Sequence, residues 1–211
     1  MSDARSVADR YAVFVSRSSV DIAADLESFA RLLAKWQRVQ NLVSRETDEL
    51  WERHFADSLQ LLKFYRGESS ILDLGSGGGF PAVPLAIALK DQPVDFTLVE
   101  SSAKKTAYLR AAARDLGLNM ETLRGRIDTF APRETSLLTS RALADLPHLL
   151  SWSAPWFGDE TRALFHKGRE HGEELDKSRA LWHFDVIVHP SETGSGGVIL
   201  EISNLKAAAT A

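Results

Sequence analysis

The feature that most constrains the fold of this chain is a run of glycines that directly follows a short strand-like segment. Residues 71–74 have the character of a buried strand, and Gly75, Gly77 and Gly79 follow at alternate positions before a helical pattern begins. Glycines let the backbone turn through angles that a Cβ forbids, and they let a ligand lie against bare peptide groups. A second acidic strand end, Glu100, comes twenty-five residues after Gly75, near the spacing at which a carboxylate holds the ribose of a nucleoside cofactor. The sequence therefore predicts a nucleoside pocket.

The residue at position 80 distinguishes between nucleoside cofactors. A dinucleotide fingerprint counted from Gly75 needs a small residue there, so that helix and strand can pack around a pyrophosphate, but the chain has Phe80. The aromatic ring favours a cofactor without phosphates, such as S-adenosylmethionine. Asp73 supports this choice, because its carboxylate can receive the ammonium group of the methionine moiety but would repel a pyrophosphate. The alternative is a glycine turn that serves only as a tight connection.

The composition removes several classes of site. With no cysteine among its 211 residues, the chain has no disulfides, thiolate metal ligands or cysteine nucleophiles. Its six histidines lack the spacing of zinc enzymes, so we expect no metal site. No apolar stretch reaches the length of a membrane span, and the N-terminus has no signal-peptide pattern. We therefore expect a cytoplasmic protein with no membrane partner.

The overall charge and the local charge clusters have different implications. A net charge of −4 argues against a protein that coats nucleic acid through its overall field. Each local cluster of cations is either a binding surface or a solvated helix face. The clusters are Lys35, Arg38 and Arg45, then Lys104 and Lys105, then Arg124, Arg126 and Arg141.

Residues 1–66 have the pattern of helices, and the rest of the chain alternates between strands and helices. Apolar residues recur at helical spacing over 21–39 and 46–65, and Ser44 or Thr47 is the expected cap of the second helix. Strands are predicted over 70–74, 95–100, 120–124, 135–140, 161–166, 183–189 and 197–203, and helices over 81–90, 102–117, 145–157 and 169–181.

This order of elements predicts an α/β fold of the Rossmann-like type. Strands that alternate with helices are joined by right-handed crossovers and run parallel. The short, turn-rich connection over 190–197 predicts an antiparallel hairpin at the sheet edge. A seven-stranded, mostly parallel sheet with a terminal hairpin is the usual scaffold of class I S-adenosylmethionine methyltransferases. We expect a helical extension over 1–66 packed on a catalytic domain over 67–206, with a frayed tail over 207–211.

Short motifs follow one another in order along residues 36–170 of the chain. They are Asn41–Ser44, Arg53–Leu59, the glycine turn with Phe80-Pro81, Val99–Ser101, Lys104-Lys105, Ser140–Ala142 and Lys167-Gly168. In these motifs the chain resembles the bacterial glucose-inhibited division protein B family, the ribosomal RNA small subunit methyltransferase G family. The resemblance implies methylation of N7 of one guanine in the decoding-centre loop of 16S ribosomal RNA, with S-adenosylmethionine converted to S-adenosylhomocysteine. The acidic charge suggests RNA within the 30S subunit or an assembly intermediate as the substrate, and we expect a monomer.

The resemblance also implies which residues contact the cofactor. They are Gly75, Phe80, Ile127, Asp128 and Arg141, to which the chemical argument adds Asp73, Gly77, Gly79 and Glu100. Two positions depart from the family, since Asp128 stands where glutamate is common and Ala82 stands where a glycine is common. Because aspartate is one methylene shorter, its contact with the adenine amino group is expected to run through backbone or water.

The expected chemistry needs positioning rather than a base. Guanine N7 carries a free lone pair at neutral pH, and the chain lacks the Asn-Pro-Pro-Tyr type of motif that exocyclic amino methyltransferases use. We expect Arg141 and Lys167 to orient the guanosine and its phosphates. Arg53, His54 and Asp57 are expected to form the wall that joins the helical part to the catalytic cleft.

Each of these assignments has an alternative. His54 and Asp57 could form a hydrogen-bonded pair on a helix surface, and Arg141 could be a salt-bridge partner of Asp73 or Asp128. At the level of function, the alternatives are a nicotinamide-dependent oxidoreductase, a non-catalytic RNA-binding or ribosome-assembly module, and a methyltransferase acting on another RNA or a small molecule.

Overall fold

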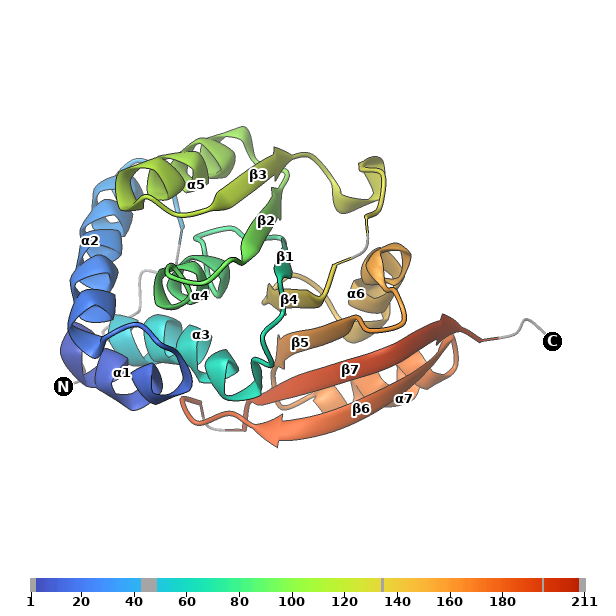
Figure 1. The fold of residues 1–211 in the computed structure, drawn as a ribbon. Coiled ribbons are helices and arrows are strands. Elements are labelled where there is room, and N and C mark those ends of the chain that lie inside the picture. The colour runs from blue at the N-terminus through green and yellow to red at the C-terminus, as the bar shows by residue number, and fades with distance from the viewer. Residues whose placement is uncertain (1–2, 43–48, 134, 195, 209–211) are drawn as a thin grey trace.

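The computed structural model describes residues 3–42, 49–133, 135–194 and 196–208, and its centre is a seven-stranded sheet (Figure 1). The strands are β1 (Ser70–Leu74), β2 (Asp95–Glu100), β3 (Met120–Arg124), β4 (Leu137–Arg141), β5 (Arg162–Lys167), β6 (Trp182–Pro190) and β7 (Val198–Ala207), in the spatial order β3-β2-β1-β4-β5-β7-β6. Neighbours among β1 to β5 are parallel, whereas β7 lies antiparallel between β5 and β6. The predicted Rossmann-like sheet with its antiparallel terminal hairpin is confirmed.

The register of the parallel strands brings the predicted site residues to one edge of the sheet. β1 lies between β2 and β4, with Leu74 opposite Val99 on one side and Ser140 on the other. The glycine turn after Leu74 therefore lies beside Glu100, the last residue of β2, and Arg141, the last residue of β4. Ligand sites of open α/β sheets lie at this carboxyl edge, where the strand order reverses.

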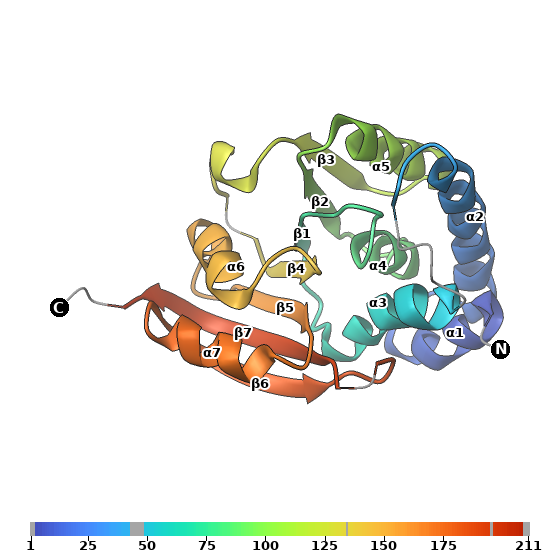
Figure 2. The ribbon, with the colours of Figure 1, turned by 180° about the vertical axis from the view of Figure 1, so that it is seen from behind.

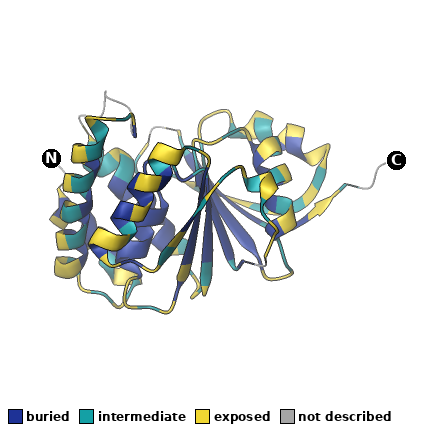
Figure 3. Ribbon diagram, turned by 90° about the horizontal axis from the view of Figure 1, so that it is seen from above, coloured by how far each residue is buried: buried dark blue, intermediate teal, exposed yellow. Residues whose placement is uncertain are grey.

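Helices lie on both sides of the sheet (Figures 2 and 3). One side has α1 (Ala4–Tyr11), α2 (Ser19–Gln37), α3 (Asp57–Leu59), α4 (Ala82–Ala88) and α5 (Ala103–Leu116), and the other has α6 (Leu146–Ser153) and α7 (His171–Arg179). Side chains alternate along a strand, so Ile71 joins the core on the first side and Leu72 the core on the second. The N-terminal helices share the first core, where Phe29, Phe55 and Phe80 pack with ring centroids between 5.3 and 5.7 Å apart.

The N-terminal region has a helix that the periodicity does not predict and a second helix of unusual geometry. α1 has eight residues, which are too few for a clear helical period, and a capping box between Asp3 and Ser6 starts it. The helix predicted over 46–65 is, in its described part, a π-helical turn over Trp51–Ala56, then α3, then a 3₁₀ turn over Gln60–Phe64.

Other element boundaries differ from the predicted ones by a few residues. β4 begins at Leu137 rather than at 135. β7 continues to Ala207 rather than to 203, because the end of this strand pairs with Trp182 of β6. The predicted helix caps Ser44 and Thr47 lie outside the described residues.

A buried ion network holds the segment before β1 against β5 and β7. Arg162 of β5 donates to Glu201 of β7 at 2.6 Å and also contacts Glu68. Glu201 accepts two further hydrogen bonds, from Arg66 at 2.7 Å and from His189 at 2.9 Å. Both Arg162 and Glu201 are buried. The network therefore fixes the N-terminal region to the sheet by charge as well as by apolar packing.

Replacing Glu201 with glutamine is expected to lower the free energy of unfolding by about 2–3 kcal/mol, because the buried Arg162 loses one of its two anionic partners and keeps only Glu68. For a chain of this length the melting temperature would fall by about 5–10 °C. Thermal unfolding measures the difference. The control is Glu27→Gln, since Glu27 pairs with Arg31 at 3.8 Å on an exposed helix face and its loss is expected to have little effect. Equal shifts in the two variants would contradict a special role for the network.

Candidate functional site

The glycine turn after β1 is held against the end of β2 by its own backbone. The amides of Gly75 and Ser76 donate to the carbonyl of Val99 at 3.0 and 3.1 Å. Gly75 and Gly77 have φ angles of +68° and +51°, in the left-handed region that glycine enters without steric cost. The side chain of Leu143 rests against Gly75, where a Cβ would collide with it. Glycine at this position therefore lets the loop after β4 approach the turn.

A cavity of about 370 Å³ opens beside this turn, and we call it the cofactor cavity. Five of the predicted cofactor contacts line it, namely Gly75, Gly77, Glu100, Ile127 and Asp128. Its volume is within the range of small-molecule sites. The structure thus brings together the glycine turn, the acidic end of β2 and the loop after β3.

Glu100 is a fixed hydrogen-bond acceptor in the cofactor cavity. One carboxylate oxygen accepts from the amide of Gly77 at 3.0 Å, and the other accepts from the amide of Ser102 at 2.7 Å. The two amides hold the carboxylate in one orientation, and Oε1 also accepts a long hydrogen bond, of 3.5 Å, from the hydroxyl of Ser101. Oε2 keeps a lone pair that can accept from a ribose hydroxyl, and a second ribose hydroxyl would displace the long bond from Ser101.

Asp73 is buried near the turn and is not part of the cavity wall. Its Oδ1 accepts from Thr139 at 2.7 Å, whereas its Oδ2 has no partner among the described residues. Burial raises the pKa of Asp73 to about 7. A buried acceptor without a donor indicates a missing ligand group, and a cation would also favour the ionised carboxylate. Its charge is complementary to the ammonium group of S-adenosylmethionine, although Oδ2 is buried and Asp73 does not line the cofactor cavity.

A 3₁₀ turn over Ile127–Thr129 contributes Ile127 and Asp128 to the cofactor cavity. Asp128 is exposed and accepts two hydrogen bonds from Arg126, at 2.7 and 3.1 Å, and these bonds lower the pKa of Asp128. Lys105 of α5 and Trp152 of α6 also line the cavity. Neither carries a sequence signal for a cofactor role, because only the fold brings α5 and α6 to this edge.

A second cavity, of about 630 Å³, adjoins the ends of β4 and β5, and we call it the substrate cavity. Arg141 and Lys167, the residues predicted to orient the guanosine, line it. So do the predicted wall residues Arg53, His54 and Asp57. The structure brings these five residues together from the π-helical turn, α3, β4 and β5.

Arg141 is the centre of the polar network in the substrate cavity. Its Nη1 donates to the carbonyl of Arg53 at 2.9 Å and to Asp57 Oδ2 at 3.2 Å. Its Nη2 donates to His54 Nδ1 at 2.7 Å. The guanidinium carbon lies 5.2 Å from the ring centroid of Phe80. Contacts on several sides give the guanidinium one orientation.

The two alternatives considered for these residues are not observed. Arg141 forms its ion pair with Asp57 and not with Asp73 or Asp128. His54 and Asp57 are not bonded to each other as a surface pair, because both face Arg141 instead. Arg141 also lines the substrate cavity and not the cofactor cavity, although the family resemblance implies a cofactor contact.

The π-helical turn explains how one helix presents several groups to Arg141. In an α-helix the amide of Asp57 would bond the carbonyl of Arg53, but here it bonds the carbonyls of Glu52 and His54. The carbonyl of Arg53 accepts from Arg141. Turns of this type are rare and occur frequently at functional sites, and no sequence pattern predicts this one.

Two histidines of the substrate cavity are neutral. Burial lowers the pKa of His54 to about 4, and the charge of Arg141 acts in the same direction. Burial also lowers the pKa of His166, whose Nε2 lies 2.8 Å from the carbonyl of Asp57. Because arginine can only donate, the proton of His54 is on Nε2, which has no partner within the described ranges. Neither histidine is a cation for phosphate at neutral pH.

Lys167 is a buried anchor at the edge of the substrate cavity. Its ammonium lies 2.6 Å from Glu174 Oε2 and donates to the carbonyl of Ala144 at 2.9 Å. Its side chain is 8% exposed. The predicted contact with RNA phosphates would require Lys167 to leave Glu174. The observed pairing favours a role in positioning the loop after β4.

Phe80 and Gly79 are predicted cofactor contacts that line neither cavity. Phe80 is buried, and its ring centroid lies 5.1 Å from that of His54. Gly79 has a φ of +88°, and a Cβ there would meet Val83. The ring of Phe80 packs against both Arg141 and His54, so it holds these side chains in place without lining either cavity.

The hairpin loop between β6 and β7 is a wall of the substrate cavity that sequence reasoning missed. Ser191, Thr193 and Gly194 line the cavity. Thr193 donates to Asp57 Oδ1 at 2.8 Å, and Gln60 donates to the same oxygen at 2.7 Å. The sequence of this loop is that of an ordinary turn. Its place in the cavity wall depends on the contact with Asp57, which only the tertiary structure shows.

Ala142 separates the two cavities, because it lines both of them. Its φ is +51°, a conformation that costs a residue with a Cβ about 1–2 kcal/mol. Strain of this kind persists where the surrounding structure imposes it, and it is common at functional sites. A cofactor in one cavity and a base in the other would meet at this residue.

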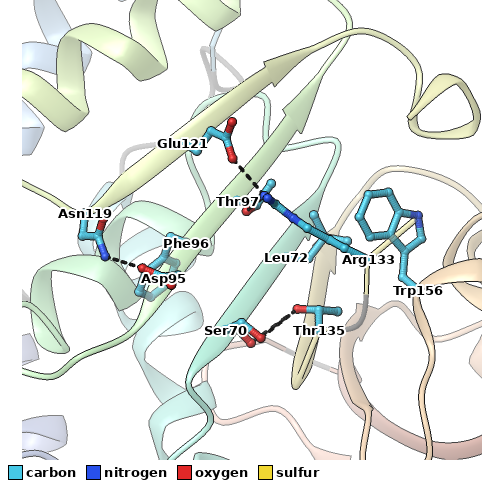
Figure 4. A pocket seen from close by; sticks show the side chains of 10 residues that line it. All are labelled: Ser70, Leu72, Asp95, Phe96, Thr97, Asn119, Glu121, Arg133, Thr135 and Trp156. Carbon is cyan, nitrogen blue, oxygen red and sulfur yellow. Dashed lines mark hydrogen bonds and ion pairs between the residues drawn. The ribbon is translucent and has the colours of Figure 1, made fainter. Parts of the chain in front are cut away.

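A third cavity, of about 430 Å³, lies toward the opposite ends of β1, β2 and β3 (Figure 4). Arg133 donates there to Thr97 at 2.6 Å and to Glu121 at 2.9 Å, and Asn119 donates to Asp95 at 2.7 Å. These polar groups satisfy one another, and none of the predicted site residues lines the cavity. We assign it no ligand.

Comparison with known proteins identifies the family. A model of the rRNA small subunit methyltransferase G family matches residues 22–198. The chain belongs to this family. It is 45% identical over 199 residues to the ribosomal RNA small subunit methyltransferase G of Rhizobium meliloti, covering 90% of this chain and 92% of the relative. It is 42% identical over 202 residues to that of Sinorhizobium fredii, covering 92% of each.

Solved structures agree with the fold of this methyltransferase G family member. An O-methyltransferase from Bacillus cereus, solved in complex with SAH, is similar with a TM-score of 0.58 over 86% of this chain and 91% of that chain, at 15% identity. The likeness shows the class I methyltransferase fold. In the part of the chain that the structure describes, none of the helices combines the length and apolarity that crossing a membrane requires.

Replacing Gly77 with aspartate is expected to lower the affinity of this methyltransferase G family member for S-adenosylmethionine by at least about 100-fold, or about 3 kcal/mol. The φ of Gly77 is +51° and its amide donates to Glu100, so a carboxylate here is both strained and repelled. Isothermal titration calorimetry measures the affinity. Gly172→Asp is the control, because a Cβ on Gly172 meets nothing within 4 Å. Normal methyl transfer by the Gly77 variant would show that the cavity assignment is wrong.

Proposed function

We propose that this chain transfers a methyl group from S-adenosylmethionine to N7 of one guanine in the decoding-centre loop of 16S ribosomal RNA. The observation that carries the proposal is the meeting of two cavities at Ala142, one with the features of a nucleoside site and one built around Arg141. Membership of the rRNA small subunit methyltransferase G family supports ribosomal RNA as the substrate.

The residues around the cofactor cavity have the chemistry that S-adenosylmethionine requires. Glu100 offers two oriented oxygens to the ribose. Asp73 offers the unpartnered Oδ2 to the ammonium group, and Ile127 and Asp128 offer a wall for the adenine. When bound, S-adenosylmethionine supplies an electrophilic methyl group on a positively charged sulfur.

A ring nitrogen is the acceptor that these residues suit best. Guanine N7 has a free lone pair, so no residue has to remove a proton before the methyl group is attacked. The pKa of His54 is about 4, and its Nδ1 already accepts from Arg141, so it is not arranged as a general base. The contribution of the network is orientation, since Arg141 is held by Arg53, His54 and Asp57.

We further propose that the substrate is 16S rRNA within the 30S subunit or an assembly intermediate, and that the chain acts as a monomer in the cytoplasm. A net charge of −4 gives little field-driven affinity for free RNA, which favours a substrate shaped by a particle.

The test of the function is tritium transfer from labelled S-adenosylmethionine to 30S subunits from cells that lack the family enzyme. Nuclease digestion and nucleoside chromatography then identify the labelled product. We expect label in 7-methylguanosine. Label in another nucleoside would overturn the ring-nitrogen chemistry. Cofactor binding without transfer to 30S subunits or naked 16S rRNA would overturn the substrate and leave the cofactor site standing.

A further inference from the structure

The lysines and arginines of this molecule fall into two groups. Most of those described lie within ion-pair distance of a carboxylate, as Arg10 does with Glu52 at 2.8 Å and Arg17 with Asp25 at 2.7 Å. Eight exposed cations differ, because no ion-pair partner for them lies among the described residues. Three of these, Lys35, Arg38 and Lys104, form what we call the basic shelf.

The tertiary structure brings the basic shelf together from two distant helices. Lys35 and Arg38 come from the end of α2, and Lys104 comes from the first turn of α5, and Figure 2 shows these helices side by side. Trp36 packs on Tyr108 with ring centroids 5.8 Å apart. Just after α2, the side-chain amide of Gln40 donates a hydrogen bond of 3.4 Å to the backbone carbonyl of Lys104 in α5.

Residues that follow the shelf cations in the chain line both cavities of the site. Lys105 follows Lys104 and lines the cofactor cavity, with its Nζ 4.0 Å from the position of a Cβ on Gly77. Leu42, just beyond the end of α2, lines the substrate cavity, as does the exposed Arg53. A polymer that places one of its units in the substrate cavity therefore passes close to the cations of the basic shelf.

Stability of the fold does not account for Lys104. Cations in the first turn of a helix are repelled by the helix dipole, and α5 has no acidic residue in its first turn to offset this. No carboxylate among the described residues lies within ion-pair distance of the three shelf cations. The electrostatic complement of the shelf is a partner with repeated negative charges, which is the character of a nucleic-acid backbone.

We propose that the basic shelf binds phosphates of the RNA that flanks the target guanine. The inference rests on the proposed function, because it takes RNA as the substrate. Phosphate contacts position a nucleic acid without reading its sequence, so the shelf contributes affinity and register and takes no part in the methyl transfer. The shelf also gives a chain of net charge −4 a local surface that attracts RNA.

The test compares two double variants that remove equal charge. Lys35→Gln/Lys104→Gln removes two of the three charges of the shelf, whereas Lys177→Gln/Lys206→Gln removes two exposed charges on α7 and β7. Tritium transfer to 30S subunits is measured at constant Mg²⁺ and at KCl concentrations from about 50 to about 200 mM, the range over which phosphate contacts weaken. For the shelf variant we expect KM for 30S to rise about tenfold and the slope of log KM against log salt to fall by about 1–1.5. Its kcat and its dissociation constant for S-adenosylmethionine are expected to stay unchanged.

The outcomes separate failure of the shelf from failure of the function. Unchanged KM and slope in the shelf variant, with an active unmodified protein, would overturn the shelf and leave the proposed function intact. Equal effects in both variants would also overturn it, because net charge would then explain them. A higher KM with an unchanged salt slope would indicate a ribosomal protein as the partner and overturn the phosphate contact. No transfer by the unmodified protein would overturn the proposed function and the shelf with it.

Discussion

Replacing Asp73 with asparagine is expected to abolish methyl transfer and, above neutral pH, to stabilise the cofactor-free protein. Asparagine keeps an oxygen for the hydroxyl of Thr139, which donates to Asp73 at 2.7 Å. It removes the negative charge that we propose as the partner of the ammonium group. The affinity for S-adenosylmethionine is expected to fall by at least about 100-fold, the scale of a lost charge-assisted hydrogen bond in a buried site.

The stability effect depends on pH because burial raises the pKa of Asp73 from 3.8 to about 7. Between these two values the unfolded chain releases the proton while the folded chain keeps it, so the stability of the native protein falls as the pH rises through this window. Above pH 7 the full cost of ionising the buried carboxyl is present. The asparagine variant has no such cost. Its relative gain in stability is expected to be absent below pH 4 and to reach at most about 4 kcal/mol above pH 8.

In the unmodified protein, ionisation of Asp73 lowers the stability of the fold but is expected to raise the affinity for S-adenosylmethionine. The ammonium group needs the charged carboxylate, so affinity for S-adenosylmethionine is expected to rise as the pH passes from 6 to 8, around the pKa of about 7. Calorimetry at several pH values measures affinity, and urea unfolding measures stability. Asp95→Asn is the control, since Asp95 is exposed and bonds Asn119 far from the turn. Normal cofactor affinity in the Asp73 variant would place the ammonium site elsewhere.

Replacing Arg141 with lysine is expected to lower kcat/KM for 30S subunits by about 100- to 1,000-fold. The guanidinium donates at once to the Arg53 carbonyl, Asp57 and His54, at 2.9, 3.2 and 2.7 Å. One ammonium cannot reproduce these three directions, so the buried acceptors of Asp57 and His54 would lose a donor and the wall of the substrate cavity would lose its shape.

The affinity for S-adenosylmethionine separates two roles of Arg141. Of the two cavities, Arg141 lines only the substrate cavity. The lysine variant is therefore expected to keep its affinity for S-adenosylmethionine to within about tenfold. Steady-state kinetics with calorimetry on the same preparation checks both quantities. Arg133→Lys is the matched control, because Arg133 lies in the third cavity and contacts Thr97 and Glu121. A loss of cofactor affinity as large as the loss of activity would make Arg141 a cofactor ligand, as the family resemblance implies.

Local sequence patterns were enough to predict the part of the site that lies close together in the chain. The strand, the glycine turn and Glu100 occupy adjacent strand ends, and the rule that parallel strands end at one edge brings them together. Gly75, Gly77 and Glu100 accordingly share one cavity. Ile127 and Asp128 line the same cavity, but the family resemblance and not a local pattern implied them. The sheet and its terminal hairpin follow from the same alternation of elements.

The environment of individual side chains could not be predicted, because it depends on contacts between distant segments. Phe80 has the sequence position of a cofactor residue, but the packing of α2 and the π-helical turn buries it beside His54. Lys167 has the charge of a phosphate ligand, but α7 supplies Glu174 as its partner. A charge in a sequence does not show whether another element neutralises it.

Local patterns in the sequence predicted the succession of strands and helices from β1 onward, the glycine turn and the acidic strand ends, because turn geometry, hydrophobic period and strand direction act over short segments. The tertiary structure alone decided which groups face one another. It set the pKa of Asp73 through burial, directed the Arg53 carbonyl to Arg141 through a π-helical turn, and placed the loop after β6 on Asp57. Burial, dielectric environment and hydrogen-bond partners are properties of the packed chain, so they arise only when remote elements meet.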